Sequence, residues 1–242
     1  MFLTSPIVNG ESMKSKALFL TLVVSSVFLG ACASENSMQS QKPANAATAN
    51  NAAANARDLI TDAEAVKTAL NVGAKMPSFT LKDIEGKPVA SDDLLKKGNL
   101  VIVFYRGAWC PFCNLYLQNL QNQAAAIKEA GGQIVAISVE NPDKSTGVAK
   151  KNELQFTVLS DPNLETARKF GIVYELPKET DEQYKSKGLD VAKNNEMEKA
   201  ELPLGATYIV RQTGEIVYAF LDTDYKKRAE PEVIIENLKK IK

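Results

Sequence analysis

The chain has 242 residues and no histidine, which excludes Ser-His-Asp catalysis, Cys-His proteolysis and histidine-ligated metal sites. Lysine plus arginine equals aspartate plus glutamate at 29 each, so no excess of positive charge indicates binding to nucleic acid. The hydrophobic content of 45% and the charged content of 24% are ordinary for a globular domain. We therefore expect one folded domain behind an N-terminal segment, and no nucleic acid among its partners.

The N-terminal segment has the pattern of a secretory signal. Residues 17–29 carry no charge, follow two lysines, and are fewer than the roughly 20 residues of a membrane-spanning helix. The run ends in Leu29-Gly30-Ala31-Cys32, which resembles the lipobox of bacterial lipoproteins and implies cleavage before Cys32 and lipidation of its sulfur. The alternative is an ordinary signal that ends near a cysteine. Met13 lies closer to the lysines than Met1 and fits the start of such a signal better.

Three parts follow from this pattern: a signal peptide over residues 1–31, a tether over residues 32–57 and a folded domain over residues 58–242. The tether is rich in alanine and asparagine and lacks aromatic and branched aliphatic residues, so it cannot bury a core. The mature protein would begin at Cys32 and lie in the cell envelope, where disulfides persist. By resemblance to Gram-negative lipoproteins, Ala33 after this cysteine favours a periplasm-facing anchor in the outer membrane.

The elements of the folded domain follow from its apolar periodicity. In chain order we expect a helix at 59–70 ended by Gly73, strands at 78–81 and 88–90, a strand at 100–105, a helix at 113–127 closed by Gly131, a strand at 133–139, a helix at 143–151, a strand at 156–159, a helix at 163–170, strands at 207–210 and 215–220, and a helix at 234–241. The continuous apolar strands at 100–105 and 133–139 are typical of parallel strands buried on both faces. This order predicts an α/β sandwich.

The charged segment over residues 175–201 does not fit that plan. Tyr184, Leu189 and Val191 are its few apolar residues. A structureless loop of this length is unusual in a compact domain, so we expect a partly helical insertion near the active-site end. The alternative is a solvated excursion without function.

The motif Cys110-Pro111-Phe112-Cys113 carries the chemistry that the sequence indicates. A tetrahedral metal site needs four ligands, and this pair supplies only half of them, so we expect no metal and no cofactor. A purely structural disulfide across two residues would close a very small loop and stabilise little. The order strand, motif, helix favours thiol redox chemistry over both alternatives.

The position of Cys110 predicts an activated thiol. Proline is favoured at the first helical position, so Pro111 makes Cys110 the N-cap residue. Unpaired N–H groups and the positive end of the helix dipole lower the pKa of a thiol there below its usual value of about 8.5. Cys113 lies one turn later on the apolar side, where we expect it to be less exposed and to resolve a mixed disulfide on Cys110.

Two neighbours of the motif are candidate supporting residues. Arg106 would add positive charge near the thiols, or else form a surface salt bridge. Trp109, the one tryptophan of the chain, would either offer a docking surface or pack in the core.

Several segments resemble a known family. Residues 72–81 (VGAKMPSFTL), 104–113 (FYRGAWCPFC), 137–139 (ISV) and 159–162 (LSDP) are similar to segments of the alkyl hydroperoxide reductase and thiol-specific antioxidant family, which includes the peroxiredoxins. The resemblance runs from about residue 72 to residue 241. It implies a thioredoxin-like three-layer sandwich with a central mixed sheet flanked by helices, and a peroxidase that is recycled by a thioredoxin-like donor.

The chain also departs from that family. Typical peroxiredoxins carry Pro, then Thr, then the peroxidatic Cys, and Arg106, Cys110 and Cys113 occupy these places here. An alignment on thioredoxin makes Cys110 the nucleophile instead, and the N-cap position also favours Cys110. Gly205 stands near the place of the thioredoxin cis-proline, and the peroxiredoxin arginine of this strand is not evident.

Three functions remain at this point. The first is reduction of hydroperoxides through the two cysteines. The second is thiol:disulfide exchange with protein disulfides in the envelope. The third is non-enzymatic copper delivery by a lipoprotein of the same fold, which the missing histidine and the short cysteine spacing disfavour.

Overall fold

The structure is a computed structural model that describes residues 61–241. The predicted signal peptide, the lipidation site at Cys32 and the tether lie outside the described residues. Within residues 61–241, no helix combines the length and the apolar character needed to cross a bilayer.

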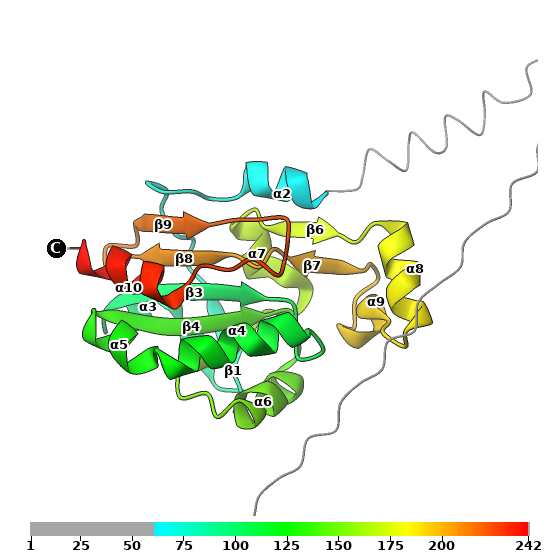
Figure 1. The fold of residues 1–242 in the computed structure, drawn as a ribbon, viewed down its shortest axis with the longest axis horizontal. Helices are drawn as coiled ribbons and strands as arrows, with labels where there is room; N and C mark the ends of the chain where they lie inside the picture. The colour runs from blue at the N-terminus through cyan, green and yellow to red at the C-terminus, as the bar shows by residue number, and fades with distance from the viewer. Residues whose placement is uncertain (1–60, 242) are drawn as a thin grey trace, which may run out of the picture. The chain divides into compact units, whose positions relative to one another are not determined.

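A seven-stranded mixed sheet forms the centre of the domain (Figure 1). Its strand order is β2-β1-β5-β4-β3-β8-β9, with β3, β4 and β5 mutually parallel and the outer strands antiparallel to their neighbours. In chain order the strands are β1 (Thr80–Asp83), β2 (Pro88–Ala90), β3 (Asn99–Tyr105), β4 (Gly132–Ser138), β5 (Thr157–Ser160), β8 (Thr207–Val210) and β9 (Ile216–Phe220).

Helices cover both faces of this sheet, which confirms the predicted α/β sandwich (Figure 1). They are α2 (Asp62–Thr68), α3 (Ser91–Leu95), α4 (Pro111–Asn122), α5 (Ala124–Glu129), α6 (Pro142–Lys151), α7 (Glu165–Lys169), α8 (Lys178–Ser186), α9 (Val191–Asn194) and α10 (Pro231–Lys239), with a short 3₁₀ turn, η1 (Pro162–Leu164).

The central strand β3 shows why both faces are covered. Leu100, Ile102 and Phe104 point into the core shared with α3 and α7, whereas Val101 and Val103 point into the core beneath α4, α5 and α10. All five side chains are fully buried. Because successive side chains of a strand alternate between faces, one continuous apolar run supplies two cores.

The predicted helix over residues 113–127 is two helices. The backbone of Gln123, at φ −105° and ψ 5°, leaves the helical region and separates α4 from α5. Leu120 and Ile127 on either side of this break remain fully buried in the same core. The predicted apolar face is therefore correct, although the helix is interrupted.

Two other helices are shorter than the pattern predicts. The first helix ends at Thr68, before Gly73, because Leu70 N–H donates to Phe170 O instead of continuing the helix. The helix predicted from residue 163 begins only at Glu165, since Asn163 and Leu164 have left-handed backbones at φ 69° and 59°.

The charged segment 175–201 contains α8 and α9, between the paired strands β6 (Val173–Glu175) and β7 (Glu201–Pro203). Val191 is fully buried, and Tyr184 and Leu189 pack against the same core. Lys144 Nζ of α6 donates to Asn194 O of α9. This segment is therefore packed onto the domain at the end of the sheet where β3 leads into α4 (Figure 1).

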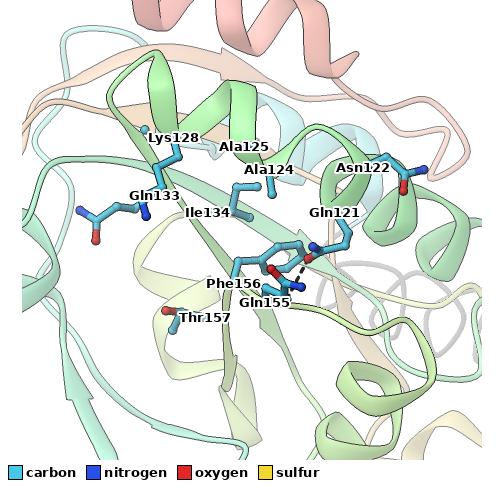
Figure 2. Close-up of a pocket in the computed structure, with 11 residues that line it drawn as sticks. Gln121, Asn122, Ala124, Ala125, Lys128, Gln133, Ile134, Gln155, Phe156 and Thr157 are labelled. Carbon is cyan, nitrogen blue, oxygen red and sulfur yellow. Dashed lines mark hydrogen bonds between the residues drawn. The ribbon is translucent and has the colours of Figure 1, made fainter.

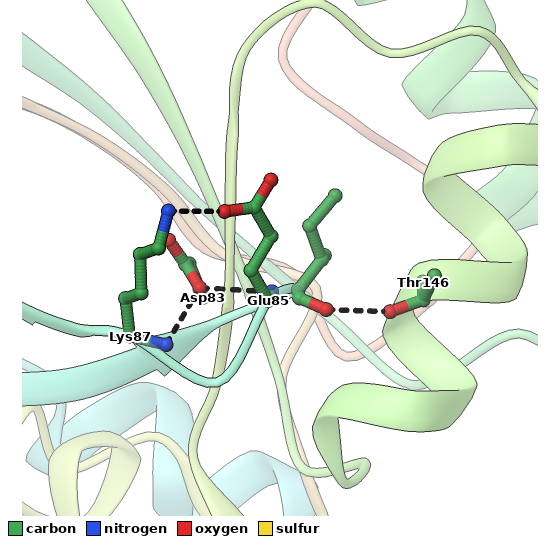
Figure 3. Close-up of polar contacts among 5 residues, drawn as sticks. Asp83, Glu85, Lys87 and Thr146 are labelled. Atoms are coloured by element: carbon green, nitrogen blue, oxygen red, sulfur yellow. Dashed lines mark hydrogen bonds and ion pairs between the residues drawn. The ribbon is translucent and has the colours of Figure 1, made fainter.

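The turn between β1 and β2 is held by its own side chains (Figure 3). Asp83 accepts hydrogen bonds from the N–H groups of Glu85 and Lys87, at 2.9 Å each. Thr146 Oγ1 of α6 donates to Ile84 O at 2.8 Å. The sheet edge is thereby tied to α6.

Candidate active site

The two cysteines of the motif lie at the N-terminus of α4, immediately after β3. Cys110 is the N-cap residue, Pro111 occupies the first helical position, and Cys110 Sγ accepts a hydrogen bond from Cys113 N at 3.3 Å. The prediction of an N-cap cysteine is thus confirmed. The two residues are joined as a disulfide, with their Cα atoms 5.2 Å apart.

The loop that enters the motif is fixed by a buried carboxylate. Glu140 Oε2 accepts a hydrogen bond from Ala108 N at 2.6 Å. Burial raises the pKa of Glu140, and the bond from Ala108 opposes this rise. Gly107 has a φ of 140°, and a Cβ there would lie 2.8 Å from Glu140 Cδ and 2.7 Å from Trp109 Nε1. Only glycine therefore allows Glu140 to approach this loop.

The amide side chains of Asn114 and Asn152 fix the first turn of α4. Asn114 Nδ2 donates to Ala108 O at 2.8 Å and to Cys110 O at 3.2 Å. Asn152 in turn donates to Asn114 Oδ1 at 3.2 Å. These contacts hold the backbone around Cys110 from two sides, so the position of its sulfur is set by the fold.

Accessibility does not distinguish the two sulfurs. Cys110 is 1% exposed and Cys113 is fully buried. Cys113 is buried as expected, but Cys110 is almost as deeply buried, so exposure gives no preference for Cys110 in this disulfide state. The arrangement is suited to a small reagent that reaches a recessed sulfur.

A buried guanidinium contacts Cys113. Arg228 Nη2 lies 3.4 Å from Cys113 Sγ, and Arg228 Nη1 lies 3.5 Å from Phe104 O. Burial lowers the pKa of Arg228 to about 10, with a smaller contribution in the same direction from the charge of Arg106, so the guanidinium is still charged at neutral pH. A charged donor at this distance stabilises a thiolate on Cys113.

The guanidinium of Arg228 occupies space that Gly205 leaves open. A Cβ at position 205 would lie 1.6 Å from Arg228 Nη1 and 2.2 Å from its Cζ. Any larger side chain would have to displace the arginine from this position. Gly205, which stands near the place of the thioredoxin cis-proline, thus makes room for the guanidinium of Arg228 from a distant part of the chain.

Tyr116 of α4 anchors the loop that carries this arginine. Its hydroxyl donates to Ala229 O at 2.9 Å and lies 3.3 Å from Thr207 Oγ1. Burial raises the pKa of Tyr116 to about 12, so the hydroxyl keeps its proton at neutral pH. The helix that bears the cysteines therefore also positions Arg228.

Arg106 and Trp109 stand beside the motif in unexpected surroundings. Arg106 is 1% exposed, so the alternative of a surface salt bridge is wrong. Its guanidinium carbon lies 4.8 Å from the centre of the Trp109 ring and 4.0 Å from that of Tyr225. Trp109 is half-buried and packs edge-on against Tyr184, so it is part of the aromatic packing around Arg106 and does not protrude as a docking surface.

The sequence did not indicate the role of Arg228. It lies 115 positions after Cys113, outside any motif and within a charged stretch that reads as ordinary surface. The one signal was Gly205, whose lack of a side chain in the otherwise buried segment between β7 and β8 is a mark of close approach.

The exposed side of the motif is apolar and basic. Phe112 is 42% exposed and Leu115 is 56% exposed. Lys226 Nζ lies 5.8 Å from the centre of the Phe112 ring. This surface lines a hollow of about 500 Å³ together with Arg228, whose guanidinium contacts Cys113, although neither cysteine lines the hollow itself.

Another hollow, of about 510 Å³, lies away from the cysteines (Figure 2). Four of its eleven lining residues carry amide side chains, and the backbone N–H of Gln155 donates to Gln121 Oε1 at 2.8 Å. Lys128 is its single charged residue. It holds none of the groups that the cysteine chemistry needs.

A profile of the AhpC/TSA family matches residues 72–219. Peroxiredoxin Bcp of Escherichia coli K12 is 34% identical over 104 residues, which are 43% of this chain and 65% of that protein. The chloroplastic peroxiredoxin Q of Populus jackii is 34% identical over 108 residues, which are 44% of this chain and 50% of that protein. The match thus spans less than two thirds of the length of these relatives.

The fold has solved counterparts. The crystal structure of peroxidoxin BcpB from Mycobacterium tuberculosis superposes with a TM-score of 0.57 at 19% identity, over 72% of this chain and 99% of that one. This similarity confirms the thioredoxin-like three-layer arrangement that the sequence resemblance implied.

Proposed function

Because the chain belongs to the AhpC/TSA family, we propose that it is a thiol-dependent peroxidase that reduces hydroperoxides through Cys110 and Cys113. One observation carries the proposal: the Arg228 guanidinium lies 3.4 Å from a buried cysteine sulfur that is paired with a helix N-cap cysteine. A thiolate is the species that attacks peroxides, and this surrounding favours it.

We propose that Cys113 attacks first. The N-cap position favours a thiolate on Cys110 through one neutral N–H group. The guanidinium favours a thiolate on Cys113, and charge-assisted hydrogen bonds are roughly twice as strong as neutral ones. This reverses the preference for Cys110 that the helix position alone gives, and it agrees with the place of Cys113 in the resemblance to peroxiredoxins.

The reaction then has two steps. The Cys113 thiolate attacks the terminal peroxide oxygen, the O–O bond breaks, and the leaving alkoxide takes a proton to become an alcohol, or water in the case of hydrogen peroxide. Cys113 is oxidised to a sulfenic acid. Cys110 attacks its sulfur, hydroxide leaves and is protonated to water, and the disulfide forms. Arg228 stabilises the initial thiolate and the negative charge that develops on oxygen.

A dithiol donor would return the disulfide to the reduced state by exchange. We propose a thioredoxin-like protein for this role, because exposed apolar side chains at Phe112 and Leu115 flank the cysteines and suit docking of a protein. The same surface fits the second candidate, an oxidoreductase of protein disulfides. The recessed sulfurs favour the small peroxide as the oxidant.

A direct comparison tests the assignment. The reduced full chain is mixed with one equivalent of hydrogen peroxide, and the consumption of peroxide is followed. In parallel, its ability to reduce the disulfides of insulin is measured. We expect rapid loss of peroxide with formation of the Cys110–Cys113 disulfide, and slow reduction of insulin. Rapid reduction of insulin without peroxide consumption would establish the second candidate instead.

We propose an envelope location from the sequence of residues 17–32, which supports lipidation at Cys32. A Cys32→Ala variant is expected to leave the membrane fraction of cells. If that variant stays with the membranes as the unaltered chain does, the anchor is not Cys32.

A further inference from the structure

Arg106 is a buried cation whose hydrogen bonds are incomplete. It is 1% exposed, and its Nη2 donates to the Tyr184 hydroxyl at 2.8 Å. A guanidinium has five N–H donors, and the Nε of Arg106 is buried with no partner among residues 61–241. No carboxylate in that described part of the chain forms an ion pair with it. A buried charge without a counter-ion is costly, which points to a ligand that supplies the negative charge.

Aromatic rings cover the faces of this guanidinium. Its carbon lies 4.0 Å from the centre of the Tyr225 ring, 4.8 Å from that of Trp109 and 5.6 Å from that of Tyr184. Rings over the faces leave the N–H edge as the side from which a ligand can be bound. A planar carboxylate matches that edge, because two of its oxygens can accept from two parallel N–H groups.

Arg106 lines a cavity of about 310 Å³, which we call the Arg106 cavity. Its walls are formed by Tyr174, Leu176, Pro177, Tyr184 and Tyr225, and its other lining residues are Asp62, Thr180, Thr223, Asp224 and Lys226. This volume and mostly apolar wall are within the range of small-molecule sites.

The Arg106 cavity adjoins the cysteine motif. Tyr225, which covers Arg106, also packs edge-on against Phe112 of the motif at 5.9 Å between ring centres. Trp109, the residue before Cys110, covers the guanidinium from another direction. A molecule held at Arg106 therefore lies beside the residues that surround the reactive sulfurs.

We propose that the Arg106 cavity binds the carboxylate of an amphipathic molecule, so that the preferred hydroperoxide is one that carries a carboxylate on an apolar chain. The site of binding stands on the geometry of Arg106, and the choice of hydroperoxide rests on the proposed function. We expect a ligand with a single negative charge, because Asp62 and Asp224 balance Arg106 and Lys226 in the lining and leave no excess of positive charge for phosphate esters and other polyanions.

Binding can be measured without turnover, because Trp109 is the one tryptophan of the chain and contacts Arg106. Octanoate and 1-octanol share an apolar chain and differ in the carboxylate. Titration of the full-length protein with each, followed by tryptophan fluorescence, should show binding of octanoate roughly tenfold or more tighter than that of octanol. The variant Arg106→Met should abolish this difference.

Lys128→Met is the matched control, since it removes an exposed cation that does not line the Arg106 cavity. We expect it to retain the preference for octanoate. Arg106→Lys keeps the charge but lacks the fork of donors, and it should show a reduced preference even if Arg106→Met does not fold. Equal affinity for octanoate and octanol in the unaltered protein, or a preference that survives Arg106→Met, would overturn the proposal.

The kinetic consequence is tested with linoleic acid hydroperoxide and its methyl ester, which differ only in the carboxylate. The ratio of kcat/KM for the acid to that for the ester should exceed one and should fall to about one in Arg106→Met. A ratio of one in the unaltered protein would overturn the choice of substrate. Failure to consume hydrogen peroxide at all would instead refute the proposed function, whatever the octanoate titration shows.

Discussion

Two clusters of buried polar residues lie at the same edge of the central sheet, where the parallel strands β3, β4 and β5 end. The serine cluster consists of Ser138, Ser145, Ser160 and Asp161, and the cysteine cluster consists of Arg106, Trp109, Cys110, Cys113 and Arg228. All members of the serine cluster are 2% exposed or less. In the cysteine cluster Arg106 and both cysteines are equally buried, whereas Trp109 and Arg228 are partly exposed.

Hydrogen bonding separates the two clusters. Ser145 Oγ lies 3.4 Å from Ser138 Oγ and 3.2 Å from Ser160 Oγ, and Asp161 accepts from the N–H groups of Thr166 and Ala167. In the cysteine cluster, by contrast, the Nε atoms of Arg106 and Arg228 and the Nε1 of Trp109 are buried with no partner among residues 61–241.

The difference indicates which cluster holds the fold and which performs chemistry. Polar groups that form hydrogen bonds with each other stabilise the folded state and have no free donor or acceptor for a ligand. Donors and positive charge held without partners are costly for the fold, and they are available to a thiolate, a developing oxyanion or a ligand. Variants of the two clusters should therefore affect different measurements.

The largest effect is expected from Arg228→Met. Loss of the guanidinium beside Cys113 should raise the pKa of that thiol and lower the rate of reaction with peroxide by roughly 100-fold. Stopped-flow rates across a pH series measure both quantities, and Arg228→Lys should retain part of the rate. A rate unchanged in Arg228→Met would remove the arginine from the mechanism.

A smaller loss is expected from Gly205→Ala. Its methyl group would occupy the place of Arg228 Nη1 and push the guanidinium away from Cys113, so the peroxide rate should fall roughly tenfold. Gly147→Ala is the matched control, because a Cβ there meets nothing within 4 Å. That control should leave the rate unchanged and stabilise α6 by about 0.5–1 kcal/mol. Equal rates in the two variants would contradict the displacement.

Asp161→Ala tests the serine cluster. Removal of the acceptor for Thr166 and Ala167 should lower the free energy of unfolding by about 1–3 kcal/mol, as measured by urea denaturation. The peroxide rate of the folded protein should not change. A rate loss comparable to that of Arg228→Met would show that the two clusters are not separate in function.

The smallest effect concerns Glu140, which lies between the clusters. Burial raises its pKa in the folded state, so the folded protein binds more protons than the unfolded chain, and the free energy of unfolding falls as pH rises through the folded pKa. Glu140→Gln keeps an acceptor for Ala108 and has no such titration. Denaturation at a series of pH values should show a shallower fall in this variant, and an identical pH dependence would contradict the assignment.

Local features of the active site could be predicted from the sequence. The continuous apolar run of β3, the proline after Cys110 and the apolar positions Leu120 and Ile127 depend on neighbours within a turn or a strand, and the structure confirms them. Periodicity and capping are short-range properties, so one sequence is enough to reveal them.

The electrostatics of the site could not be predicted in this way. Arg228 reaches Cys113 from a loop, and Arg106 is buried by aromatic side chains from the segments around Tyr184 and Tyr225. These contacts depend on the packing of distant segments, for which the sequence carries no period or motif. The near-complete burial of Cys110 depends on tertiary contacts of the same kind, so the sequence did not reveal it either.

The most direct test of the central claim is the reaction of the two single-cysteine variants with one equivalent of hydrogen peroxide. Cys110→Ser retains Cys113 beside Arg228, and it should consume the peroxide and form a sulfenic acid that a dimedone probe detects by mass spectrometry. Cys113→Ser should consume peroxide far more slowly. Rapid consumption by Cys113→Ser together with an inert Cys110→Ser would contradict the claim that the Arg228 guanidinium selects the attacking sulfur.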